Sequence, residues 1–270
     1  MPTPWAHPQP SGWGRWHLSF PRQLHIRCRR TSTGLTIAGT GKLVLKGASP
    51  NTFVEPVTVG NGTTLGTILE LGKAGALGAN TSVTVNTGGT LLLDDVGTND
   101  RINNTAAVIL NGGKIAFSGN VIEDSSPGTG ALTLTDVSVI DFAFGNSIIN
   151  FANSTAAIWT GGKILSIYNW DGSTSGGGND QIIFGTSNST GLTPTQLGQV
   201  SFYTGGLGSS FLGNGQILAN GEVVPNLVPV PEPSAVAVAM GLLGLVGWRE
   251  RRNAAVSRRS EIIEMSRDSR

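Results

Sequence analysis

The sequence predicts an all-β protein: a parallel β-solenoid of about eight coils, followed by one short C-terminal transmembrane helix. Three observations predict the solenoid: a motif that recurs about every 24 residues, an apolar–polar alternation within each copy, and a composition of 39 Gly with only 13% charged residues. Alternation at every second position is typical of strands, whose successive side chains point to opposite faces. A Greek-key sandwich also has short strands and Gly turns and stays open as the alternative, but it does not require fixed offsets between copies.

The repeated motif is a Gly, any residue, and then an apolar residue. Its copies begin at Gly41, Gly66, Gly89, Gly113 and Gly162, with steps of 25, 23, 24 and 49 residues, the last being two periods with a blurred copy near residue 137. Apolar residues recur at even offsets from this Gly: Ile37, Val85, Ile109 and Ile158 four before, Leu35, Val83, Ala107 and Ala156 six before, and Leu45, Leu93 and Phe117 four after. Even offsets place these side chains on one face, so stacked coils would form aliphatic ladders. The second copy fits poorly, because Gly62 and Glu70 occupy apolar positions.

The chain divides into five segments. We expect a disordered or wrongly assigned N-terminus over 1–33, solenoid repeats over 34–163, a C-terminal cap of the solenoid over 164–225, a sorting signal over 226–252, and a disordered charged tail over 253–270. Within the cap, Thr193 and Pro194 predict a short helical turn over 195–200, because they suit the N-cap and first-turn positions. Residues 201–204 are expected to form a strand. The aromatic residues expected to cover the last ladder are Trp170, Phe184, Phe202, Tyr203 and Phe211.

The composition excludes several classes of function. Residues 34–229 hold six basic and twelve acidic residues but no His and no Cys, which excludes Ser-His-Asp, Cys-His and His-metal chemistry from the part expected to fold. The single Cys excludes a disulfide framework. A net charge of +1 argues against nucleic acid as a partner, and a basic nucleic-acid arm at the N-terminus is a minor alternative. We assign no catalytic residue, no metal site and no cofactor.

Two acidic groups invite a catalytic reading. Asp94, Asp95, Asp100 and Arg101 share one predicted loop, and carboxylate pairs can serve sugar hydrolysis or hold Ca²⁺. A solvated, charged turn is the favoured interpretation. Residues 176–182 partly resemble a Ca²⁺-binding nonapeptide, but that motif needs tandem copies, so a flexible loop is favoured there.

A second pair of carboxylates, Asp136 and Asp141, lies five residues apart. The odd offset would place the two side chains on opposite faces of a strand, which makes them poor candidates for a dyad.

The tail carries the strongest sequence signal. Val230, Pro231, Glu232 and Pro233 precede an uncharged, mainly apolar run over 235–248, and the cluster Arg249, Arg251 and Arg252 follows. A helix over 235–248 would span about 21 Å, short of the roughly 30 Å hydrocarbon core. The Arg cluster nevertheless predicts a stop-transfer, and local thinning of the bilayer can absorb the mismatch.

The N-terminal segment does not fit an exported protein. Export needs an apolar signal segment of about 7–15 residues, and residues 1–33 contain none. We therefore expect a truncated gene or a misplaced start codon, with the export signal outside this sequence. Residues 253–270 are given no role.

Two resemblances follow from these motifs. Residues 39–48, 76–80 and 82–91 resemble the autotransporter-associated β-strand repeat, a family that implies a passenger-type β-helix on an exported bacterial protein. The order Pro-Glu-Pro, apolar run and Arg cluster closely resembles the PEP-CTERM sorting signal, which is also catalogued as an ice-binding-protein C-terminal domain. That resemblance implies processing by an exosortase, an integral-membrane cysteine protease, with Val230, Pro231, Glu232 and Pro233 as the recognition motif and Arg249, Arg251 and Arg252 as the membrane stop.

The expected function is that of a non-enzymatic, exported bacterial cell-envelope protein, a structural or adhesive β-solenoid. Its expected partners are an exosortase-type protease and the membrane, with extracellular polysaccharide as a further candidate. It would be membrane-anchored before processing and then lie at the surface or outside the cell. The alternatives are a polysaccharide lyase or hydrolase on the same scaffold, and an ice-binding module with a flat Thr/Asn-rich face.

Overall fold

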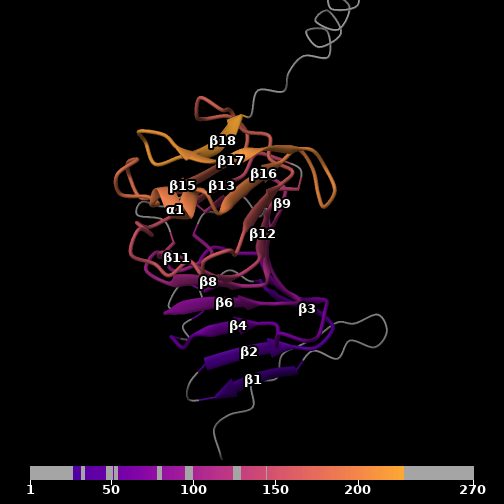
Figure 1. Ribbon diagram of the computed structural model, residues 1–270. Helices are drawn as coiled ribbons and strands as arrows, with labels where there is room; N and C mark the ends of the chain where they lie inside the picture. Colours follow the sequence, from indigo (N-terminus) through magenta and orange to yellow (C-terminus); the bar gives the residue numbers. More distant parts are fainter. Residues whose placement is uncertain are drawn as a thin grey trace, which may run out of the picture. The chain divides into compact units, whose positions relative to one another are not determined.

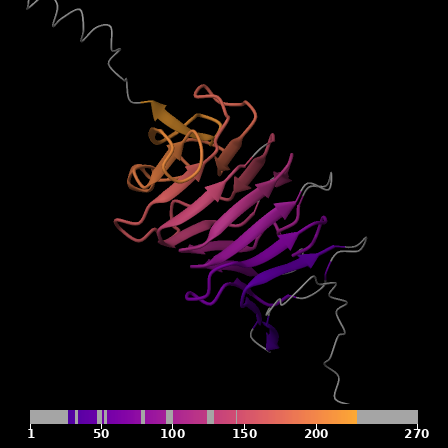
Figure 2. The ribbon, with the colours of Figure 1, turned by 90° about the vertical axis from the view of Figure 1, so that its right-hand side faces the viewer.

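The computed structural model describes residues 27–31, 34–46, 51, 54–77, 81–94, 100–123, 129–143 and 145–227. In these ranges the chain forms eighteen strands and one short helix, so the predicted all-β class is confirmed. Figures 1 and 2 show the strands stacked one above another, from β1 and β2 at the N-terminal end to β16, β17 and β18 at the C-terminal end.

The strands form three sheets. The first sheet contains, in order, β1 (Arg27–Thr31), β2 (Gly34–Ala38), β4 (Val57–Val59), β6 (Ser82–Asn86), β8 (Ala107–Asn111) and β11 (Leu132–Asp136). The long sheet contains β3 (Gly41–Leu45), β5 (Thr67–Leu71), β7 (Gly89–Asp94), β9 (Lys114–Ser118), β12 (Ser138–Asp141), β14 (Leu165–Tyr168), β16 (Val200–Tyr203), β17 (Phe211–Ile217) and β18 (Val223–Leu227). The short sheet contains β10 (Ile122–Glu123), β13 (Ile148–Phe151) and β15 (Gln181–Phe184).

The predicted parallel β-solenoid is confirmed, with about five turns rather than the expected eight. From β2 to β12, each turn places one strand in the first sheet and the next in the long sheet, as in the pair β2 and β3, whereas among the described residues the first sheet has no strand that leads into β14 or β16. The turns lengthen toward the C-terminus: Ser138 pairs with Leu165 and Leu165 with Val200, which are steps of 27 and 35 residues. A constant period of about 24 residues over 34–225 therefore predicts more turns than the structure has.

Aliphatic ladders fill the interior, as predicted from the alternation. In the long sheet one ladder consists of the paired residues Leu43, Leu69, Leu91, Ile115, Ile140, Ile167 and Phe202, all buried. In the first sheet the matching ladder consists of Ile37, Val59, Val85, Leu110 and Leu134. Stacked rings continue the same pattern, since the ring centroids of Phe117 and Phe142 lie 4.9 Å apart. Each turn thus completes the burial of the next one.

The predicted register is wrong in the second copy of the motif. Thr67, not Gly66, pairs with Gly41 and Gly89, so Leu69 and Leu71 take the core positions. Glu70 then points away from the core, which explains why it did not fit an apolar position.

The register also differs from the prediction in two later copies. Ile109 and its neighbour Ala107 face outward, and Val108 and Leu110 are buried instead. Ile158 is 71% exposed rather than a core residue. The cause is the corner between the two sheets, whose length differs from turn to turn.

The parallel stacking continues beyond residue 164, where the cap was expected to begin, through β14 and β16. The predicted helical turn is α1 (Pro194–Leu197), which Thr193 caps, and the predicted strand is β16. β17 and β18 then pair antiparallel at the end of the long sheet. Trp170, Phe184 and Phe202 are buried, whereas Phe211 is 48% exposed and so lies outside the core.

No helix within the described ranges is long and apolar enough to cross a membrane. The helix predicted over 235–248 lies outside those ranges.

Candidate functional site

The residues predicted to form the sorting signal lie outside the part of the chain that the structure describes. They are Val230, Pro231, Glu232, Pro233, Arg249, Arg251 and Arg252. Their roles stay predictions, and the geometry of possible sites is considered on the solenoid itself.

The loop that contains Arg101 does not form a solvated turn at that residue. Arg101 is almost completely buried, and its Nε donates to the backbone carbonyl of Asp94 at 3.0 Å. Asp95, the other member of the predicted carboxylate pair, lies outside the described residues. Because the guanidinium is directed to backbone carbonyls in the interior, it cannot hold an acidic substrate at the surface.

Arg101 has a partner that the sequence pattern does not indicate, the carboxylate of Glu123. The Glu123 carboxylate accepts the backbone N–H groups of Arg101 and Ile102 at 3.0 and 2.8 Å. Burial raises the pKa of Glu123 to about 7, although these N–H groups and the Arg101 charge act in the opposite sense. One feature of the sequence could have indicated this pair: Glu123 follows Arg101 by 22 residues, which is close to one period of the repeat.

Asp136 and Asp141 are not brought together. Each has its own lysine: Asp136 Oδ1 lies 2.7 Å from Lys163 Nζ, and Asp141 Oδ2 lies 3.3 Å from Lys114 Nζ. The hydrogen bond from Lys163 lowers the pKa of Asp136. The two carboxylates belong to different strands, β11 and β12, rather than to opposite faces of one strand, and they form no dyad.

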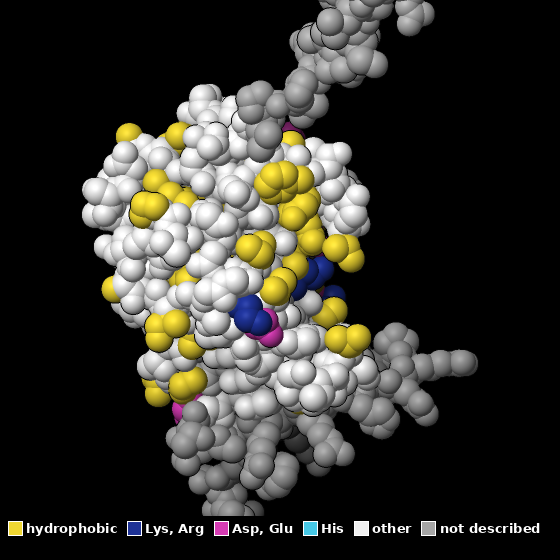
Figure 3. Space-filling view, viewed as in Figure 1, with side chains coloured by type: hydrophobic (Ala, Val, Ile, Leu, Met, Phe, Trp, Pro, Cys, Tyr) yellow, Lys and Arg dark blue, Asp and Glu magenta, His cyan; other side chains and the backbone are white. Residues whose placement is uncertain are grey.

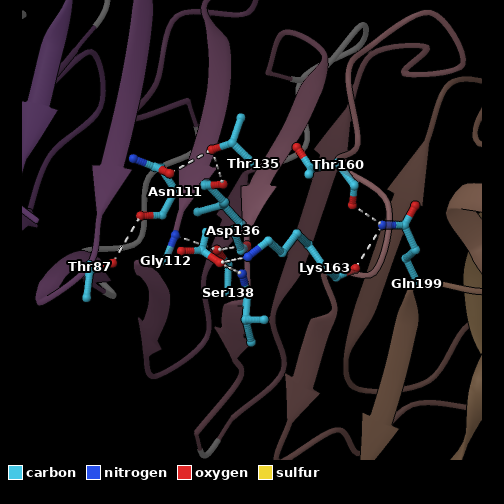
Figure 4. A network of polar contacts seen from close by, with 11 residues as sticks. Thr87, Asn111, Gly112, Thr135, Asp136, Ser138, Thr160, Lys163 and Gln199 are labelled. Carbon is cyan, nitrogen blue, oxygen red and sulfur yellow. Dashed lines mark hydrogen bonds and ion pairs between the residues drawn. The ribbon is translucent and has the colours of Figure 1, made fainter.

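A ladder of polar side chains links successive turns at the corner between the first and long sheets, and Figure 4 shows its end at Asn111 and Thr135. Asn111 Nδ2 donates to Asn86 Oδ1 at 2.9 Å, and Asn86 Nδ2 donates to the carbonyl of Gly60 at 3.0 Å. Thr135 Oγ1 donates to Asn111 Oδ1 at 2.9 Å. These bonds join four turns through amide and hydroxyl groups, so we interpret the ladder as a structural element of the corner.

The loop over 176–182 is held by hydrogen bonds. Asp180 is buried, and its two carboxylate oxygens accept the backbone N–H groups of Ser147 and Asp171 at 3.2 and 2.9 Å. Burial raises the pKa of Asp180 to about 6. Glu222 accepts the N–H of Gly177 at 2.8 Å. Within the described ranges, no group of three or more His, Cys, Asp or Glu side chains could hold a metal ion.

The outward face of the first sheet carries a threonine row. Thr36, Thr58 and Thr84 pair across β2, β4 and β6, and Ile109 and Thr133 continue the same row on β8 and β11. The strand spacing of about 4.8 Å separates adjacent members of such a row. The row is therefore a regular array of hydroxyl and methyl groups, interrupted once by Ile109.

The outward face of the long sheet carries paired charges. Lys42 contacts Glu70, Lys46 Nζ lies 3.3 Å from Glu70 and 3.5 Å from Asp94, and Lys114 contacts Asp141. Each lysine on this face therefore has a carboxylate partner, and the face has little net charge. Hydrogen bonds to Glu70 and the charges of Glu70 and Asp94 raise the pKa of Lys46.

Comparison with known proteins finds no match: no family model, no curated protein and no solved structure matches the chain.

Proposed function

We propose that this chain is an exported bacterial cell-envelope protein, a structural or adhesive β-solenoid sorted through its C-terminal signal. An exosortase-type protease would read Val230, Pro231, Glu232 and Pro233 while the apolar run lies in the membrane. The cluster Arg249, Arg251 and Arg252 would stop transfer on the cytoplasmic side. After processing, the solenoid would lie at the surface or outside the cell.

The observation that best supports this proposal is the stacking of turns into sheets with regular outward faces. A solenoid exposes the same strand positions turn after turn, so it offers an extended surface for contact with a polymer or with neighbouring molecules. The paired lysines and carboxylates on the long sheet keep that surface close to neutral, which favours contact with uncharged material.

The proposal is tested by replacing Pro231, Glu232 and Pro233 with Ala in the full chain, placed behind a cleavable export signal and expressed in a bacterium that encodes an exosortase. We expect the triple variant to stay unprocessed in the membrane fraction, while the unaltered chain is shortened and leaves it. A matched control replaces Arg258 and Arg259 with Ala, because these residues change the charge of the tail outside the signal. Unchanged location and size of the triple variant would refute the proposed sorting.

Ice binding is a second candidate, supported by the threonine row on the first sheet. A flat array of hydroxyl and methyl groups could order water at a regular spacing. This candidate predicts thermal hysteresis or inhibition of ice recrystallisation by the purified chain, and loss of both on replacing Thr58 and Thr84 with Lys. Absence of both activities in the unaltered chain would remove it.

The enzyme alternative receives less support. An enzyme of this class needs clustered Asp residues with a basic residue in one groove. Arg101, the basic residue of the candidate loop, is instead buried against backbone carbonyls. Cleavage of an acidic polysaccharide that is abolished by Asp95→Asn would favour an enzyme nevertheless.

A further inference from the structure

The two tyrosines of the chain lie next to each other on the outward face of the long sheet. Tyr168 follows the buried Ile167 in β14, and Tyr203 follows the buried Phe202 in β16, so both tyrosines point away from the core. Their ring centroids lie 5.2 Å apart, and Phe211 in β17 lies 5.7 Å from Tyr203. We name Tyr168, Tyr203 and Phe211 the aromatic row.

The aromatic row runs across the strands. Asp141 pairs with Tyr168 in the sheet, and Tyr203 pairs with Phe211, so the row extends the line of Asp141 from β12 to β17. The space-filling view shows apolar side chains gathered over the same region, around β16, β9 and β12, with lysine beside them (Figure 3). A ligand that followed the row would therefore lie along the stacking direction of the turns.

The rings are partly open to solvent although the core next to them is complete. Phe211 is 48% exposed, and Tyr168 and Tyr203 are half-buried. The planes of neighbouring rings meet at 64° and 61°, so in each contact the edge of one ring meets the face of another. A ring that presents its edge to a neighbour leaves its own faces outside that contact. Such faces are apolar surfaces with a phenol hydroxyl at the rim.

Fixed polar groups lie at the β12 end of the row. Asp141 Oδ1 accepts a hydrogen bond from Asn169 Nδ2 at 2.6 Å and from the backbone N–H of Ala143 at 3.2 Å, and its Oδ2 accepts one from Lys114. Asn169 has a φ of 55°, a left-handed conformation that Asn tolerates better than most residues. The carboxylate, amide and ammonium groups beside Tyr168 are thus held in place by one another.

The combination of apolar rings and fixed hydrogen-bonding groups fits a sugar polymer. A pyranose ring has apolar C–H faces that can lie on aromatic rings and hydroxyl groups at its edge that bind carboxylates, amides and ammonium groups. The charge balance selects among sugar polymers, because Lys114, like Lys42 and Lys46, already has a carboxylate partner. An acidic polysaccharide would have to compete with these carboxylates for each lysine.

We propose that the aromatic row, together with Asp141, Asn169 and Lys114, binds a neutral polysaccharide whose chain lies along the stacking direction of the solenoid. This inference rests on the proposed adhesive function and adds the ligand class and the residues that hold it.

The test measures binding of the purified full chain, in detergent micelles, to cellohexaose, hexa-N-acetylchitohexaose and laminarihexaose by calorimetry. We expect at least one of these neutral oligosaccharides to bind, and its dimer to bind more weakly because it covers less of the row. Tyr203→Ala should weaken binding by about ten-fold or more, whereas Tyr203→Phe keeps the ring and should retain most of it. Ile158→Ala is the matched control, since Ile158 is an exposed apolar residue outside the row.

Three results would overturn the inference: no binding to any of the three oligosaccharides, equal binding by Tyr203→Ala and the unaltered chain, or tighter binding to alginate fragments than to the neutral sugars at low salt. The sorting experiment is independent of this one. If the sugars bind but the Pro231, Glu232 and Pro233 variant is sorted normally, the proposed sorting fails and the sugar site remains. If the variant is missorted but no sugar binds, only the sugar site fails.

Discussion

Arg101 and Glu123 form an ion pair inside the solenoid, with Nη1 of Arg101 3.7 Å from Oε2 of Glu123 and exposed side-chain fractions of 1% and 2%. The two residues belong to successive turns. Each is also bound to the backbone, because Arg101 donates to carbonyls and Glu123 accepts N–H groups from residues 101 and 102. The pair therefore joins two turns at a place where neither charge reaches water.

Removing one partner of this pair should destabilise the protein strongly. We expect Arg101→Met to lower the free energy of unfolding by about 3–5 kcal/mol, because it leaves the Glu123 carboxylate buried without its countercharge. Chemical denaturation followed by circular dichroism measures the change. The matched control is Lys163→Met, which breaks the exposed pair with Asp136 and should have a far smaller effect, because water screens that pair. An equal decrease in the free energy of unfolding in the two variants would show that the buried pair contributes no more to stability than the exposed pair.

The stability of the solenoid should fall as the pH rises from about 4.5 to about 7. Burial raises the pKa of Glu123 from an ordinary 4.5 to about 7 in the folded chain, so the unfolded chain loses this proton first. Between the two values each increase in pH favours the unfolded state, and the full difference is about 3 kcal/mol. The free energy of unfolding, measured by urea denaturation across this range, provides the test.

Glu123→Gln is the control for that pH dependence, because Gln does not titrate. The variant should have a flatter profile between these two pH values than the unaltered chain. Asp180, whose pKa is raised to about 6, still titrates in the variant and should leave part of the slope. An identical slope in both proteins would contradict the assignment to Glu123.

The ladders of the core could be predicted from the sequence, whereas their register could not be predicted fully. Leu43, Leu91 and Ile115 stand two residues after the Gly of the motif, and they lie in one ladder as the motif predicts: Leu91 pairs with Ile115 directly and is joined to Leu43 through Leu69. In the turn that contains β4 and β5, seven residues separate Val59 from Thr67. In the next turn only three residues separate Val85 from Gly89. A constant offset cannot describe a corner of variable length. The motif therefore places Gly66 at the start of the strand, where the structure has Thr67.

The buried polar contacts could not be predicted from the sequence either, because they also depend on how the turns stack. Arg101 and Glu123 look like surface residues of two separate loops, and only the stacking of two turns brings them together. The aromatic row has the same origin, because Tyr168 and Tyr203 are 35 residues apart and meet through the pairing of β14 with β16. Local patterns indicate which face a side chain takes, and the register of the turns decides which side chain lies beside it.

Close stacking of turns should make Gly130 intolerant of a side chain. A Cβ added there would lie 2.5 Å from the backbone carbonyl atoms of Ala106 in the preceding turn, which cannot move without shifting the sheet. We expect Gly130→Ala to cost about 1–3 kcal/mol. At Gly161 an added Cβ meets nothing within 4 Å, so Gly161→Ala should be neutral or slightly stabilising. Thermal unfolding compares the two variants, and equal melting temperatures would contradict the stacking seen at Gly130.

Gln196 should matter more to stability than the helix cap in which it takes part. Its Oε1 accepts the N–H of Thr193, and its Nε2 donates to the carbonyls of Ser154 and Ala157 at 2.9 and 3.1 Å, so it fastens α1 to an earlier part of the chain. Thr193→Ala removes one cap acceptor and should cost about 1 kcal/mol. Gln196→Glu keeps the size and the bond to Thr193 but cannot donate when ionised, and it places a negative charge against two carbonyls. We therefore expect it to cost about 2–3 kcal/mol at neutral pH in chemical denaturation. If Gln196→Glu were as stable as the unaltered chain, donation from Nε2 would not be what holds α1 in place.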